Sequence, residues 1–172
     1  MAAGTRTFYG KYRAKVLANV DPQQLGRLTL EIPDVLGSQP STWALPCLPA
    51  AGRQMGVFAL PPVGATVWVE FEQGDPDRPV WTGGWWGQAA ELPALALAAP
   101  PGQQNIVLQT SGQNTLLVTD TPGPTGGIVL RSKSGVTLIV NDTGIYLSNG
   151  RDASITLVGG TVAFNQTALT VS

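Results

Sequence analysis

The sequence contains no histidine and a single cysteine, which excludes several kinds of active and metal site. Without histidine the chain can build neither a His-dependent catalytic triad nor a His-ligated zinc site. Cys47 has no second cysteine with which to form a disulfide or a thiol pair for a metal, and we expect it to be an inert core thiol. We therefore expect a protein that is not an enzyme and needs no cofactor.

Charge is also scarce, since only 12% of the 172 residues are charged against roughly 25% in ordinary soluble domains. A chain with so few charged side chains is typical of an oligomer that hides part of its surface. The net charge of −1, without clustered Lys and Arg, argues against a nucleic-acid partner. No apolar run approaches the roughly 18 residues that cross a bilayer, and the N-terminal segment MAAGTRTFYG lacks the apolar region of a secretory signal.

The composition changes near residue 88. All five Trp precede that point, whereas Thr, Ser, Asn, Gly, Val and Leu dominate after it. Prolines in the intervening segment QAAELPALALAAPPG disfavour a long helix and favour an extended connector. We therefore expect an N-terminal tail over 1–8, a first domain over 9–87, a connector over 88–102 and a second domain over 103–172.

The first domain has the pattern of short strands joined by turns. Apolar and polar residues alternate over 12–18, 28–32 and 66–71, and shorter strands are expected at 43–45, 55–60 and 79–81. Five or six short strands without a helix predict a small closed barrel, of which the five-stranded OB-fold is the commonest kind. The fold class is therefore all-β.

The second domain is an array of apolar residues spaced two apart, so that they share one face of successive strands. Each unit is too short to bury its own apolar face, which leaves a single-chain solenoid or an assembly of several chains. We favour an intertwined trimeric β-helix, in which three chains form a triangular prism about 40 Å long and share their ladder hydrogen bonds. The residues expected at the trimer axis are Ile106, Leu108, Leu116, Val118, Ile128, Leu130, Val136, Leu138, Val140, Ile145, Leu147, Ile155, Leu157, Val162, Phe164, Leu169 and Val171.

Two pairs of acidic residues in the first domain could suggest chemistry. Glu70 and Glu72 share a strand face, as glycosidase carboxylates might be placed, but a solvated outer face explains them more simply. Asp75 and Asp77 could ligate calcium, yet Asp-Pro-Asp beside Gly is ordinary turn chemistry. We favour the solvated face and the turn.

Three tryptophans close the first domain. Trp81, Trp85 and Trp86 could form a stacking platform for single-stranded nucleic acid, as aromatic side chains do in some OB-folds. Few basic residues flank them, and large aromatic side chains commonly anchor protein interfaces. We therefore predict that they lie at a trimer or partner interface.

The segments GRLTLEIPDV, WALPCLPAAG and GVFALPPVGATVWVEFEQGDPDRPVWTGGWW follow one another in an order that resembles the central spikes of contractile tails. This family includes phage baseplate assembly protein V and the valine-glycine-repeat spikes of type VI secretion. The most specific piece joins the strand that contains Pro62, Gly64, Val67, Val69 and Phe71 to the hairpin over 74–79. The resemblance covers residues 9 to 87, and the later array is similar to the family's trimeric needle in character alone.

The resemblance implies a structural role: a homotrimeric, membrane-piercing spike in the baseplate of a phage tail or of a cytoplasmically assembled injection particle. It further implies a separate hub protein bound to the OB domains, the tail tube above them, and the target cell envelope as the surface struck. The family's short spikes can close their tip around a His-bound metal, which this sequence lacks, so the tip at 170–172 is expected to be bare or capped by another protein. The alternative is an OB-fold and solenoid module that binds carbohydrate or nucleic acid.

Overall fold

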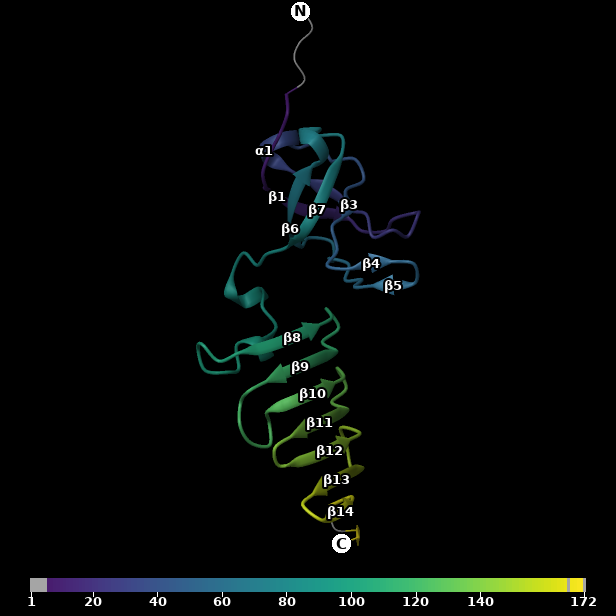
Figure 1. Ribbon diagram of the computed structural model, residues 1–172, viewed down its shortest axis with the longest axis vertical. Helices are drawn as coiled ribbons and strands as arrows, with labels where there is room; N and C mark the ends of the chain where they lie inside the picture. Colours follow the sequence, from purple (N-terminus) through teal and green to yellow (C-terminus); the bar gives the residue numbers. More distant parts are fainter. Residues whose placement is uncertain (1–5, 167, 172) are drawn as a thin grey trace, which may run out of the picture. The chain divides into compact units, whose positions relative to one another are not determined.

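The computed structural model describes residues 6–166 and 168–171, with the backbone alone for 170 and 171. The chain divides into two compact units, Met1–Ala89 and Ala90–Ser172 (Figure 1). Both consist almost entirely of strands and turns, which confirms the all-β class. The segment expected to be an extended connector contains two short 3-10 turns, η2 (Ala89–Glu91) and η3 (Ala94–Ala96).

The first unit is a curled five-stranded sheet with the strand order β2-β1-β6-β7-β3. Its strands are β1 (Tyr12–Ala18), β2 (Thr29–Glu31), β3 (Leu45–Pro46), β6 (Thr66–Phe71) and β7 (Pro79–Gly84). Neighbours are antiparallel except β3 and β7, which are parallel. The backbones of Leu28 and Ala44 exchange hydrogen bonds of 3.1 and 2.8 Å just before β2 and β3, so the two edges of the sheet meet and the barrel closes.

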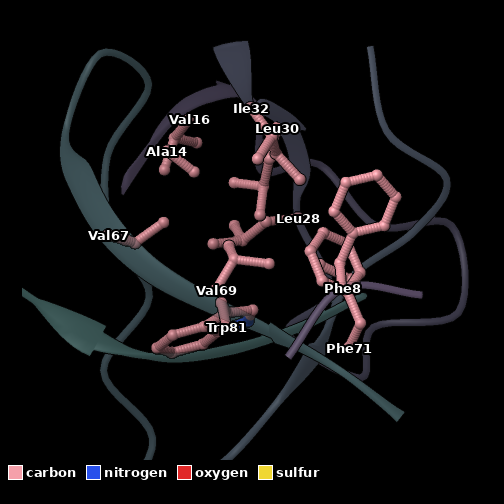
Figure 2. Packing of buried hydrophobic residues seen from close by; sticks show 11 residues of the cluster. Phe8, Ala14, Val16, Leu28, Leu30, Ile32, Val67, Val69, Phe71 and Trp81 are labelled. Carbon is pink, nitrogen blue, oxygen red and sulfur yellow. The ribbon is translucent and has the colours of Figure 1, made fainter. Parts of the chain in front are cut away.

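Alternating side chains of these strands fill the barrel. Val16, Leu28, Leu30, Val67 and Val69 are almost completely buried. Aromatic side chains complete the cluster in Figure 2, where the rings of Phe8 and Phe71 lie 6.1 Å apart. The alternation read from the sequence over 12–18 and 66–71 therefore predicts the buried face correctly.

Two local expectations for this unit were wrong. The strand expected over 55–60 ends at Gly56, because β4 (Ala51–Gly52) and β5 (Met55–Gly56) form only a short hairpin and residues 57–60 are exposed coil. Cys47 is exposed rather than a core thiol. It follows β3, where its N–H donates to the carbonyl of Trp81 at 2.9 Å, so the backbone joins the sheet while the side chain stays outside the core. The remaining helical pieces are α1 (Pro33–Leu36) and η1 (Glu72–Gly74).

The second unit is an eight-stranded antiparallel meander in which each described strand pairs with its neighbours along the chain. Its strands are β8 (Asn105–Gln109), β9 (Thr115–Thr119), β10 (Gly127–Arg131), β11 (Thr137–Asn141), β12 (Gly144–Ser148), β13 (Ser154–Val158), β14 (Thr161–Phe164) and β15 (Leu169–Val171). The expectation of ladder hydrogen bonds between chains was wrong for these strands. From β9 to β14 both backbone edges of each strand are used within the same chain, so further chains can associate with them only through side chains.

Candidate functional site

The register of the meander places the residues expected at the trimer axis on one face, which we call the apolar face. One column along this face contains Ile106, Val118, Ile128, Val140, Ile145, Leu157 and Val162. The second column contains Leu108, Leu116, Leu130, Leu138, Leu147, Ile155, Phe164 and Leu169. The backbone of Val171 pairs with Val162 at the end of the first column, but its side chain lies outside the described residues. Val136 lies in the turn before β11 rather than in a strand.

Most of the apolar face is open to solvent in the single chain. Ile106 and Leu108 are 61% and 63% exposed, and Leu130 and Leu147 remain 47% and 40% exposed in the middle of the sheet. A groove of about 960 Å³ runs along the second column, where apolar side chains of the column and polar residues of the adjoining strand ends and turns line it. An apolar surface that continues over this many strands is typical of an interaction site, because isolated soluble chains rarely expose one.

The opposite face of the same sheet is better covered. Leu117 and Val129 are each 7% exposed and are the buried hydrophobic residues described in this unit. Leu117 is flanked on its strand by Thr115 and Thr119, whose hydroxyls donate to the side chains of Gln109 and Asn105. These hydrogen-bonded polar pairs cover the flanks of Leu117. Leu117 and Val129 were not among the core residues expected from the sequence, although each stands between the two residues of an apolar pair.

Asparagine side chains and glycines hold the turns of the meander together. Asn114 accepts the N–H of Lys133 at 3.1 Å from a neighbouring turn, and Asn165 accepts the N–H of Ser154 at 2.9 Å. A Cβ on Gly150 would lie 2.7 Å from the backbone carbon of Gly135, so these two turns pack backbone against backbone. Successive turns therefore brace one another.

The three tryptophans predicted at an interface occupy different places in the first unit. Trp81 is 5% exposed and its indole N–H donates to the carbonyl of Gly26 at 3.1 Å, so it belongs to the barrel core rather than to an exposed interface. Trp85 is half-buried against Trp68, with 5.8 Å between ring centroids. Trp86 is 60% exposed.

The acidic pairs are engaged in local structure. Glu70 forms an ion pair with Lys11 at 3.0 Å on the outer face of the barrel, and Glu72 pairs with Arg78. The carboxylate of Asp75 accepts the N–H of Asp77 at 3.0 Å, which is the turn geometry expected from the sequence. In the described part of the chain, no group of three His, Cys, Asp or Glu side chains is placed to hold a metal ion.

One strong electrostatic feature was not foreseen from the sequence. Asp21 is buried in the loop between β1 and β2, where Arg27 donates to its carboxylate at 2.6 Å and the N–H groups of Gln23 and Leu25 donate at 2.9 Å. The hydrogen bond from Arg27, followed by those from the backbone, holds the pKa of Asp21 well below its usual range. Arg27 also lies 5.2 Å from the ring centroid of Trp43, so this ion pair fixes the loop against the barrel.

A closed β-barrel followed by a sheet with one exposed apolar face is typical of a protein that assembles with other chains. Residues 12–86 match the model of the type VI secretion system and phage-baseplate injector OB domain. Residues 105–170 match the model of the phage baseplate V C-terminal trimerisation domain. The chain therefore belongs to the baseplate V family of contractile-tail proteins, as the sequence resemblance predicted.

Family membership gives this chain a structural role in the baseplate, in the tail of a phage or of a related contractile particle. The families matched are structural baseplate proteins rather than enzymes. The second match identifies the eight-stranded unit as a trimerisation domain, which supports a homotrimer. Over the residues that the structure describes, no helix is long and apolar enough to cross a membrane.

Proposed function

We propose that three copies of the chain pack their apolar faces around a common axis and form the central spike of a contractile tail. The observation that carries this proposal is the exposed apolar face of β8–β14, whose two columns consist of apolar side chains alone. Because the strands already satisfy their own backbone hydrogen bonds, chains can join through this face without exchanging strands.

The sheet suits a shaft that must not bend. Eight strands spaced ~4.8 Å apart extend about 34 Å along the axis. Bending such a shaft would separate apolar side chains of three chains and also break braced turns within each chain. We propose that sheath contraction drives this shaft through the target envelope. The OB domain would bind a separate hub protein below the tail tube, with the exposed Trp86 as a candidate contact.

The mass of the purified full-length chain in solution tests the trimer. Light scattering at micromolar concentration is expected to give three times the chain mass of 18.0 kDa. A monomer under these conditions would contradict the proposal.

Hub docking is tested by co-purification of the chain with the candidate hub protein from the same particle. The native chain is compared with Trp86→Ala, and equal recovery of the hub by both would show that Trp86 is not part of the contact.

The puncturing role requires the assembled particle. Particles assembled with a trimer-deficient chain should be compared with native particles for baseplate structure by electron microscopy and for delivery into target cells. We expect loss of delivery. Normal delivery by particles that lack an assembled spike would refute puncturing by this protein, whether or not the trimer itself forms.

A further inference from the structure

The two ends of the strands in the second unit carry opposite charge. Because consecutive strands are antiparallel, the turns alternate between the two ends, as Figure 1 shows. End A comprises the turns 110–114, 132–136 and 149–153, with the strand termini beside them, and end B comprises the turns 120–126, 142–143 and 159–160. End A carries Arg131, Lys133, Arg151 and Asp152, whereas end B carries Asp120 and Asp142.

None of these charges is neutralised within the described part of one chain. All six side chains are exposed, and the ion pairs of the described residues lie in the first unit. The charged turns of the two ends also alternate in height along the direction in which the strands stack. The turn of Lys133 joins β10 to β11, between the levels of Asp120 and Asp142, and the turn of Arg151 lies one strand beyond Asp142. One such step is ~4.8 Å, within reach of a Lys or Arg side chain.

We propose that, in the trimer proposed above and resting on it, end A of each chain meets end B of the next chain at every corner. Consider a ring of three parallel chains whose apolar faces point inward. Each corner of this ring joins end A of one chain to end B of the next. The contact is therefore heterologous and occurs three times. Lys133 then faces Asp120 and Asp142, and Arg151 faces Asp142. The second copy is the partner that this charge separation fits.

The same arrangement explains why the charges are separated at all. A chain that entered the ring upside down would place end A against end A and end B against end B, and like charges would oppose each other at those corners. Exposed ion pairs add little affinity, but charge complementarity sets orientation, register and association rate. The separated charges therefore select a parallel trimer with all three C-termini at one end.

Disulfide trapping tests the corner directly in the full-length chain. In a Cys47→Ser background, Lys133→Cys combined with Asp142→Cys puts one thiol at each end. Within a chain these thiols lie at opposite ends of five-residue strands, ~16 Å apart, whereas a disulfide needs Cα atoms within about 7 Å. Mild oxidation is therefore expected to give a covalent trimer on a non-reducing gel. The matched control, Lys133→Cys alone, has its introduced thiol at end A and is expected to give no covalent oligomer, because no end A meets another end A.

The outcomes separate the corner from the trimer. A sample that is trimeric by light scattering but gives no covalent trimer, or a control that crosslinks equally well, overturns the corner and leaves the trimer standing. A monomeric Cys47→Ser parent overturns the trimer and the corner together.

A charge swap gives an independent measurement. Lys133→Glu with Arg151→Glu makes both ends acidic and is expected to slow trimer assembly after dilution from denaturant at least about tenfold at low ionic strength. Adding Asp120→Lys and Asp142→Lys to that variant makes end B basic and should restore the rate. Failure of the combined variant to recover overturns the proposal.

Discussion

Replacing Leu138 with aspartate tests whether the apolar face lies at the trimer axis. Leu138 lies in the second column between Leu130 and Leu147 and is half-buried in the single chain. The change therefore adds a charge that solvent can still reach in the monomer. In the trimer, the same change would place three carboxylates around one axis.

The expected cost follows from burial. A fully buried leucine contributes ~1.5–3 kcal/mol, and about half of that is gained on assembly by a side chain that is already half-buried. Three chains thus lose ~2–4 kcal/mol of apolar burial, and each carboxylate taken from water costs several kcal/mol more. The total is on the order of 10 kcal/mol per trimer. Because each ~1.4 kcal/mol is a factor of ten in an equilibrium constant, no trimer should remain at micromolar concentration.

Light scattering after size exclusion measures the effect, with Thr156→Asp as the control. Thr156 pairs with Tyr146 and Ala163 in the middle of the same sheet but on the opposite face, so its carboxylate should be tolerated. Circular dichroism should show β structure in both variants. A normal yield of trimer from Leu138→Asp, or equal disruption by Thr156→Asp, would refute the assignment of the apolar face to the axis.

Three further perturbations address stability. Arg27 holds the pKa of Asp21 below its usual range, so stability from this ion pair is present above the ordinary carboxyl pKa near ~4 and is lost as the pH falls. Between pH 6 and pH 3 the unfolding midpoint of the native chain should therefore fall further than that of Asp21→Asn; equal decreases would contradict the pairing. Leu28→Ala should cost about 2–5 kcal/mol, measured by denaturant titration with Trp fluorescence, which reports the first unit because every Trp lies there; a loss below ~1 kcal/mol would contradict the buried position. Gly150→Ala combines a positive φ of 74° with a backbone clash and should lower trimer melting by scanning calorimetry, whereas Gly160→Ala meets no neighbour and should have little effect.

The apolar face of the second unit could be predicted from the sequence because the alternation of apolar and polar residues depends only on local strand geometry. Side chains of an extended strand alternate between two faces, so residues two apart, such as Ile128 and Leu130, must share one. The antiparallel register then aligns pairs from successive strands, and the apolar face follows. The same alternation identified Val67 and Val69 as buried in the barrel.

The pairing partners of the strands depended on contacts that alternation does not encode. A period of two is equally compatible with a ladder between chains and with a meander within one chain. Short turns such as 142–143 decide in favour of the meander, since a connection of this length joins adjacent antiparallel strands. The apolar pairs carry no information on turn length, and for that reason the ladder hydrogen bonds were wrongly expected between neighbouring chains.

An all-β chain without histidine chemistry, a barrel followed by repeated strands, and the residues of one continuous apolar face could all be read from the sequence. Those features depend on composition and on backbone periodicity, which are local. Three features became visible only in the folded chain: Trp81 lies in the core while Trp86 lies outside, Asp21 is buried beside Arg27, and opposite charges gather at opposite strand ends. Each of these depends on which segments the closed barrel and the meander bring together, and no short stretch of sequence specifies that.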